Sequence, residues 1–545
     1  MKRLPRPLFV IALLLVVSAS GTSAVQDQHD HGGPTGRLGT VHFETSCAPA
    51  VAQEFDRGVA QLHSFWFSAS IEAFNGVLKR DPECAMAYWG IAMSWWGNPF
   101  GGFRSSEALK AGLTAVERGK AANAKTERER EYLAAVEALF KDPAAIPQRA
   151  RTLDYEQRMA GLSAKYPADT EARIFYALAL DQTALPTDKT YANQLKAAAI
   201  LEQEFSKQPN HPGLAHYIIH SFDTPVLAPR ALDAARRYAT IAPAAPHALH
   251  MPSHTFTRVG AWQDSIETNI ASAAAARKDN APAEELHALD YQVYAYLQTA
   301  QDAAAKKSLD GIGEIGARIQ LNAPGAAAPP PAGFYALAAI PARYALERGA
   351  WKEAAVLVPR ETPFAFADAV THFARALGAA RSGNPAAAAK DVEKLASLRD
   401  ALQKANDAYW TGQVEIQRRI ATAWIALAEG RQAEALTMLR DAADAEDLTD
   451  KSAISPGPIK PARELLGEML LELRRPADAL REFEATMAKE PNRFRGLYGA
   501  SRAAEAAGDH AKARSYSLRL VEICRGADKP GRPELQQAAT ASRGQ

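Results

Sequence analysis

LGEMLLELRRPADALREFEATMAKEP, residues 466–491, is the stretch that decides the fold. Its small residues Gly467 and Ala479 stand where two helices of one unit would approach each other closely. The bulky Phe483 would fill the gap to the following unit, and Pro491 would end the second helix. The stretch therefore predicts a helix-turn-helix unit of about 34 residues.

The same offsets recur along the chain. Further copies carry Gly58, Ser70, Phe74 and Pro82; Leu201 and Pro209; Ala231, Ala235, Tyr238 and Pro243; and Ala513, one period after Ala479. In this pattern the chain resembles the tetratricopeptide repeat (TPR) family, over about 400 residues between about positions 50 and 525. The resemblance implies an all-α fold, a right-handed α-solenoid of TPR-like helix-turn-helix repeats whose first helices face a concave groove. Abundant alanine and few runs of β-branched residues also favour helix throughout.

The N-terminus has the pattern of an export signal. Lys2, Arg3 and Arg6 precede an apolar run over residues 8–17, and small or polar residues follow up to Ala24. We expect residues 1–24 to be a cleaved signal peptide, which makes this a periplasmic or secreted repeat protein of the bacterial type. An apolar run of roughly ten residues is about half of what a bilayer-spanning helix needs, so no stable membrane insertion is expected.

Composition divides the rest of the chain. Residues 322–333 read NAPGAAAPPPAG, which is typical of a linker. A second loop is expected at 449–460. The predicted organisation is a flexible N-terminal segment at 25–45, an N-terminal TPR-like block at 46–321, the Pro/Ala linker at 322–333, a C-terminal TPR-like block at 334–525 and a disordered tail at 526–545.

The charge of the chain argues against a nucleic-acid partner. The 545 residues carry 63 Lys and Arg against 62 Asp and Glu. Removal of the signal peptide would bring the net charge to about −2. Nucleic-acid-binding proteins usually present a strongly basic face, and nothing in this balance provides one. We expect the ligand of the groove to be an unidentified protein, peptide or small molecule.

The cysteines are Cys47, Cys84 and Cys524. In an oxidising compartment two of them can pair. Cys47 lies just before one expected helix and Cys84 just after the next, and an antiparallel helix pair would bring those two ends together. We therefore expect a Cys47–Cys84 disulfide, and the alternative is two free buried thiols.

Histidine is concentrated in one part of the chain. If Pro209 and Pro243 end their repeats, the next first helices begin near Pro212 and Pro246 and carry most of these histidines. Six of the thirteen histidines fall within 44 residues: His211, His216, His220, His247, His250 and His254.

The register of the two helices points to a metal site. His216 and His220 are four residues apart, and so are His250 and His254, so each pair shares one helical face. Neutral imidazoles on neighbouring helices suit a divalent transition metal such as zinc or copper. We predict metal ligands at His216, His220, His250 and His254, with His247 close by.

Other polar residues are candidates for an outer shell or for the wall of the groove. Carboxylates beside imidazole ligands commonly orient them, and a tyrosine can contribute a hydroxyl. The residues in question are His287, Asp290, Asp223, Tyr217 and His63.

Three functions remain open at this point. The first is an exported binding protein whose groove holds a ligand, either through a histidine-bound metal or through the imidazoles alone. The second is a metal-dependent enzyme, a hydrolase or an oxidoreductase, although the pairs read HYIIH and HMPSH and lack the His-Glu-x-x-His pattern of metalloproteases. The third is a metal-free scaffold for protein–protein interaction. The sequence assigns no catalytic residue, and fold alone does not choose among the three.

Overall fold

The computed structural model describes residue 1 and residues 37–102, 104–321 and 327–543, and every regular element in these parts is helical. The signal peptide expected at residues 1–24 therefore lies outside the described residues, apart from its first. Among the described helices none combines the length and the apolar character needed to cross a bilayer.

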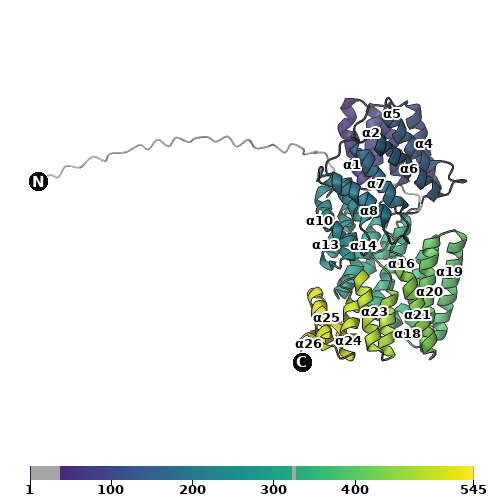
Figure 1. The fold of residues 1–545 in the computed structure, drawn as a ribbon, viewed down its shortest axis with the longest axis vertical. Helices are drawn as coiled ribbons and strands as arrows, with labels where there is room; N and C mark the ends of the chain where they lie inside the picture. Colours follow the sequence, from purple (N-terminus) through teal and green to yellow (C-terminus); the bar gives the residue numbers. More distant parts are fainter. Residues whose placement is uncertain (2–36, 103, 322–326, 544–545) are drawn as a thin grey trace.

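The helices follow one another along the chain in pairs (Figure 1). The first group is η1 Pro49–Val51, α1 Ala52–His63, α2 Phe67–Arg80, α3 Ala85–Trp96, α4 Ser106–Ala121, α5 Glu127–Phe140, α6 Gln148–Lys165, α7 Thr170–Thr183 and α8 Ala192–Phe205. The middle group is α9 Pro212–Ser221, η2 Ala228–Ala231, α10 Leu232–Ile241, α11 Pro246–His250, α12 Pro252–Arg258, α13 Trp262–Lys278, α14 Pro282–Gln298 and α15 Asp302–Gly316. The last group is α16 Pro330–Glu347, α17 Trp351–Ala355, α18 Ala365–Arg381, α19 Pro385–Lys404, α20 Ala408–Ala428, α21 Gln432–Asp447, α22 Ala462–Glu472, α23 Pro476–Lys489, α24 Phe494–Ala506, α25 His510–Ile523 and α26 Pro533–Ser542.

The repeat pattern is confirmed in the packing of these pairs. The Phe483 ring on α23 lies between Gly467 of α22 and Gly499 of α24, where an added Cβ would come within 2.9 and 2.3 Å of the ring. At the other end of the chain, Phe74 of α2 lies in the same way against Gly90 of α3, 2.2 Å from a Cβ placed there. A bulky ring thus joins each unit to the next, and the fold is an α-solenoid of TPR-like repeats.

Proline begins many of the helices, because its missing N–H would have no partner in the first turn. Pro212 and Pro246 begin α9 and α11, as the sequence predicts. The expected single helix from Pro246 is wrong, because it stops at His250 and α12 starts at Pro252. Pro252 has no N–H for the carbonyl four residues earlier, so it interrupts the helix where the histidines lie.

Residues 322–326 of the predicted 322–333 linker lie outside the described residues, and its last four residues are helical. Pro330 begins α16, so residues 330–333 form the first turn of a helix. This helix packs directly on α14 across the expected boundary. Farther along, the Trp262 indole donates to the carbonyl of Asn492 at 2.7 Å. The last repeats therefore return to the middle of the chain, where the yellow helices lie beside the teal ones (Figure 1).

The tail predicted to be disordered contains a helix, and the described part of the segment predicted to be flexible, residues 37–45, packs on the repeats. In the tail, α26 covers residues 533–542, and Arg532 just before it bonds to the Asp302 carboxylate, with Nε 2.9 Å from Oδ2. Residues 37–45 have no regular structure: Thr40 bonds to the Asn210 carbonyl beside α9, and Phe43 is buried in the first repeats against Phe55, Trp89 and Tyr132. Apolar side chains in these short segments bury surface against finished repeats, which composition alone does not reveal.

Cys47 and Cys84, the pair expected from the sequence, are joined by a disulfide with an S–S distance of 2.05 Å. The bond ties the segment before α1 to the start of α3, around the first helix pair. Cys524, at the end of α25, is a buried free thiol.

Candidate metal centre

Four neighbouring helices bring six histidines to one place. α9, α11, α12 and α14 meet there, and α10 and α13 pack behind them. Five of the six side chains have exposed fractions of 4% or less, and His220 is partly buried. The contributing residues are His216 and His220 on α9, His247 and His250 on α11, His254 on α12 and His287 on α14.

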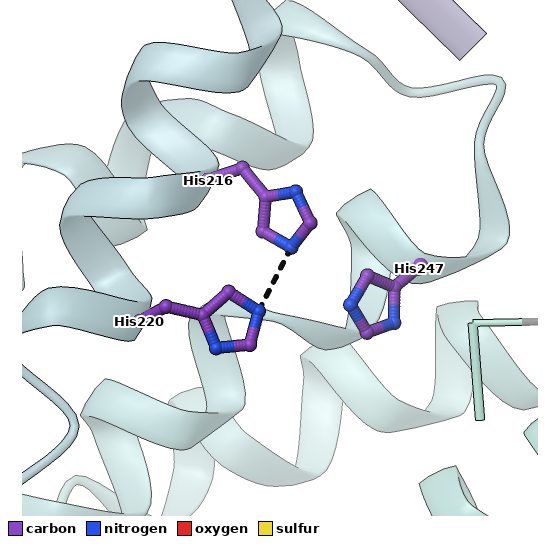
Figure 2. Close-up of side chains that lie close together, drawn as sticks. All are labelled: His216, His220 and His247. Carbon is purple, nitrogen blue, oxygen red and sulfur yellow. Dashed lines mark hydrogen bonds between the residues drawn. The ribbon is translucent and has the colours of Figure 1, made fainter. Parts of the chain in front are cut away.

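Three of these residues, His216, His220 and His247, form what we call the first triad. One nitrogen from each lies within 4.8 Å of the other two. Figure 2 shows His216 and His220 projecting from one helix, a turn apart, with His247 facing them from the neighbouring helix. The Nε2 atoms of His216 and His220 are 3.1 Å apart.

His250, His254 and His287 form the second triad, again with one nitrogen from each within 4.8 Å of the others. The Nε2 atoms of His250 and His254 are also 3.1 Å apart. The two triads adjoin, because the ring centroids of His247 and His250 are 5.8 Å apart and those of His220 and His254 are 6.1 Å apart. The sequence prediction that the two histidine pairs meet at one spot therefore matches their geometry.

Hydrogen bonds fix the tautomers of two rings of the second triad, His250 and His254. The Asn269 amide nitrogen donates to the Ser265 carbonyl at 2.7 Å, so the amide oxygen faces His250 and accepts from its Nδ1 at 2.7 Å. The Asp223 carboxylate accepts from Nδ1 of His254 at 2.8 Å. Both imidazoles thus carry a proton on Nδ1 and a lone pair on Nε2. These are the lone pairs that face each other across 3.1 Å.

Two facing lone pairs repel each other unless a proton or a cation lies between them. Burial lowers the pKa of His250 well below its usual value, and His287 and His254 lower it further. Burial, together with Lys451, lowers the pKa of His254 to about 4. A shared proton is therefore disfavoured at neutral pH, whereas a metal ion would accept both lone pairs.

The first triad has the same kind of support. Nδ1 of His216 donates to the His63 carbonyl at 2.6 Å, and Nδ1 of His247 donates to the Glu284 carboxylate at 3.1 Å. The Nε2 atom of His247 is buried and has no hydrogen-bond partner among the described residues. Burial, with His220 and His247 nearby, holds the pKa of His216 well below its usual value. An outer nitrogen bonded to a carbonyl or carboxylate and an inner nitrogen left free is the usual arrangement of metal-bound histidines.

A loop from the C-terminal repeats completes the surroundings of the cluster. The 448–461 loop joins α21 to α22, and its Lys451 ammonium donates to Asp223 at 2.8 Å. Arg258 donates to the same carboxylate at 2.9 Å. Burial alone would raise the pKa of Asp223, but Lys451, Arg258 and His254 hold it well below its usual value. Asp223 is therefore an ionised acceptor that orients His254.

The cluster is covered, and the expectation that it lines an open groove is wrong. A cavity of about 10 Å³ lies against it, enough for about one water molecule. Three segments line this cavity beside the histidines: residues 98–101, 327–332 and 453–454. Two of them belong to stretches whose composition suggests a linker or a loop, and both fold over the inner helices. The histidines that touch the cavity are His220, His247, His254 and His287.

Asp290, expected beside the metal, has another partner. Its carboxylate bonds to Arg343 Nε at 3.0 Å, and neither residue is exposed. Burial raises the pKa of Asp290 to about 6, against the opposing effect of Arg343. Arg343 also donates to the carbonyls of Gly457 and Pro458, at 2.9 and 2.8 Å. Asp290 thus holds the 448–461 loop in place through Arg343 instead of contacting the cluster.

The His63 ring and Tyr217 also lie outside the cluster. Glu171 accepts from His63 Nε2 at 2.8 Å and from His211 Nε2 at 2.9 Å, and the Tyr217 hydroxyl is 3.0 Å from His63 Nδ1. These side chains form a buried hydrogen-bonded network around Glu171, in which Nδ1 of His211 has no hydrogen-bond partner among the described residues. The first triad is contacted by the backbone carbonyl of His63 and by the Tyr217 ring, whose centroid lies 5.1 Å from that of His216.

The sequence analysis does not predict several residues that hydrogen-bond to the cluster or to its carboxylates. Glu284 lies one turn before His287 on α14 and could have been found from that spacing. Asn269 lies on α13 behind the inner helices, and Lys451 is 228 residues from Asp223. No spacing rule connects residues so far apart, so only the folded chain reveals them.

No protein-family model matches the sequence, and no curated protein matches it. A TPR protein from Parabacteroides merdae is 12% identical in sequence, covers 55% of this chain and 98% of its own, and has a TM-score of 0.28. Human IFIT1, solved as a dimer with m7Gppp-AAAA, is 11% identical over 77% of this chain and 87% of its own, with a TM-score of 0.38. A monomeric IFIT1 mutant with Gppp-AAAA is 13% identical over 88% and 96%, with a TM-score of 0.38. Such scores carry no argument about the ligand of this chain.

Proposed function

We propose that this TPR-like solenoid is an exported protein that holds a transition metal at the six-histidine cluster in its interior. The observation that carries the proposal is the approach of His250 Nε2 to His254 Nε2 at 3.1 Å, with the proton of each ring engaged on the opposite nitrogen. A cation between these atoms turns a repulsive contact into two coordinate bonds.

The spacing of the nitrogens supports this proposal. Zinc–imidazole bonds of about 2.0–2.1 Å at tetrahedral angles place two ligand nitrogens about 3.3 Å apart. The Nε2 pairs of α9 and of α11 with α12 are both at 3.1 Å. Little rearrangement of either pair is needed to admit an ion. Zinc and copper are the metals that fit such all-imidazole sites.

Because the histidines are buried, we favour a permanently bound ion over a catalytic metal that acts on large substrates. The histidines are almost all buried, and the cavity of about 10 Å³ beside them has space for about one water molecule, which leaves little room for a large substrate. We therefore place the metal-dependent hydrolase behind metal binding as a proposal.

The test is the metal content of the protein, purified without an affinity tag and dialysed extensively. We expect at least about one equivalent of zinc or copper per chain, since buried anchored imidazoles hold such ions tightly. The double variant His216→Ala/His250→Ala should lose it. A wild-type protein with no more metal than this variant contradicts the proposal.

A matched control separates the cluster from histidine in general. His510 lies exposed on α25 and contacts Glu505 at 3.0 Å. The variant His510→Ala should keep the full metal content. Both variants are compared by circular dichroism and by thermal unfolding, so that loss of metal through loss of fold is recognised.

The export part of the proposal has separate support. Residues 1–24 have the pattern of a signal peptide, and a disulfide such as Cys47–Cys84 persists in oxidising compartments. Fractionation of cells that express the full chain should place it outside the cytoplasm, and N-terminal sequencing should find cleavage near Ala24. A chain retained in the cytoplasm with Met1 intact would contradict export and leave metal binding untouched.

A further inference from the structure

We propose that the cluster binds two metal ions that share one cavity, one ion in the first triad and one in the second. This inference rests on the proposed metal binding and adds the number of ions and the kind of ligand that joins them.

The grouping of the donors points to two sites. Six imidazole nitrogens exceed the four ligands that zinc usually takes. They separate into two sets of three, and within each set the nitrogens lie within 4.8 Å of one another. Each triad also has its own carboxylate in the outer shell, Glu284 on His247 and Asp223 on His254. The support that a metal ligand needs is thus present twice.

The triads are close enough to share a ligand. The ring centroids of His247 and His250 are 5.8 Å apart, and those of His220 and His254 are 6.1 Å apart. Two-metal sites in enzymes have ions about 3.5–4 Å apart, which adjoining rings at these distances allow.

The cavity lies where such a shared ligand would be. An ion held by three protein ligands keeps an open coordination position. The cavity is touched by two histidines of the first triad, His220 and His247, and by two of the second, His254 and His287. Its volume of about 10 Å³ fits about one water molecule. Both open positions therefore face the same small space.

The charge of the site indicates what fills that space. Both triads consist of histidines alone, whose imidazoles are uncharged when they bind a metal, and no carboxylate belongs to either triad. The Asp223 charge is already opposed by Lys451 and Arg258. Two divalent ions would leave a buried excess of positive charge, which a bridging hydroxide reduces, and metal binding lowers the pKa of water enough to form it. The inferred ligand is a water-derived hydroxide between the two ions.

The number of ions is tested by equilibrium dialysis of the metal-free protein against zinc, followed by elemental analysis. Two zinc ions per chain are expected. One ion per chain would overturn the pair and leave the proposed metal binding intact. No bound zinc or copper would overturn both.

Variants of single triads test the assignment of each ion. His247→Ala removes a ligand of the first triad and His287→Ala a ligand of the second, and each variant should bind one zinc ion. Retention of two ions by either folded variant would overturn the assignment. His287→Gln, which keeps the side-chain volume closer to that of histidine, replaces His287→Ala if the latter fails to fold, and His510→Ala should bind two.

The shared cavity is tested with copper by electron paramagnetic resonance. Two bridged Cu²⁺ ions couple, so the spin intensity of the wild-type protein should be well below its copper content. The His247→Ala and His287→Ala variants should give intensities equal to their copper content. A wild-type protein with two copper ions and full intensity would show separate sites and overturn the bridge.

Discussion

At the scale of single residues, four acceptors bind the outer nitrogens, Nδ1, of four cluster histidines. The His63 carbonyl, Glu284, Asn269 and Asp223 each accept from an Nδ1 atom, at distances from 2.6 to 3.1 Å. They orient the rings, while burial disfavours protonation of His216, His250 and His254 inside the protein. Neutral buried imidazoles in turn make the stability of the metal-free protein depend on pH.

The free energy of unfolding of the metal-free protein should fall as the pH is lowered from about 7.5 to about 5. Unfolded histidines titrate near pH 6.5, whereas burial holds the pKa of His254 at about 4 and those of His216 and His250 well below the usual value. Between these values the unfolded chain binds more protons, so acid favours it, by up to about 3 kcal/mol for one such histidine. Urea unfolding in the presence of a chelator measures the effect.

A variant identifies the source of this dependence. His250→Gln/His254→Gln removes two of the buried imidazoles, so its stability should fall less steeply over the same pH range. An equal slope in the variant and in the wild-type protein would mean that other groups cause the dependence.

The sequence predicts part of the site at this scale and for a clear reason. His216 and His220, or His250 and His254, lie one helical turn apart, and that spacing places both rings of a pair on one face. The roles of Lys451 and Asn269 depend on how distant elements pack. Asp290 bonds to Arg343 instead of lying beside the histidines for the same reason. It lies about one turn after a cluster histidine on the same helix, yet its side chain faces a different neighbour.

At the scale of helices, the contact between successive repeat units is the feature that most affects stability. Gly499 of α24 lies so close to Phe483 that an added Cβ would be 2.3 Å from the ring. Gly499→Ala should therefore lower the free energy of unfolding by about 1–3 kcal/mol, because overpacking forces the ring or the helix to move. Chemical denaturation measures the change.

A second glycine provides the matched control. Gly412 lies inside α20, and an added Cβ there would meet nothing within 4 Å. Gly412→Ala should stabilise the protein by about 0.5–1 kcal/mol, since alanine favours helix and glycine does not. Changes of the same sign at both positions would contradict the packing argument.

The helices themselves could be predicted well, and their exceptions have physical causes. Glycine, phenylalanine and proline at fixed offsets determine the packing of α22 and α23, so the repeat was readable from residues 466–491. The break at Pro252 was readable in principle, because proline cannot continue a helix undisturbed. The helix at 533–542 was missed because its polar composition hides the few side chains that it buries.

At the scale of the whole molecule, buried charged side chains connect repeats that are distant in the sequence. Arg493, which is fully buried, bonds to Glu464 of α22 at 2.9 Å, to Glu347 of α16 and to the Tyr294 hydroxyl of α14 at 2.5 Å. Arg493→Met should cost about 3–5 kcal/mol, because it leaves carboxylates buried without their partner. Thermal and urea unfolding measure the loss.

An exposed arginine is the control for this change. Arg440 lies on the surface of α21, and Arg440→Met should change the stability by less than about 0.5 kcal/mol. If Arg493→Met changed the free energy of unfolding as little as Arg440→Met, the junction between the repeats would depend on apolar packing instead of these ion pairs.

The arrangement of the whole molecule was the least predictable part. The sequence indicates that repeats follow one another, but the return of α22–α24 to α12–α14 depends on the summed curvature of many units. The 448–461 loop reaches the cluster only because of that return. A groove predicted from local register was therefore replaced by an enclosed site.

The 448–461 loop would also govern how fast the proposed ion leaves. The Lys451 ammonium of the loop donates to Asp223 at 2.8 Å, and Arg343 donates to two backbone carbonyls of the loop. If release of the proposed ion requires this loop to open, the escape rate would be that of a protein motion and not of ligand exchange at the metal. Increasing amounts of a chelator would accelerate removal only up to a plateau, and the plateau rate would report how often the loop opens.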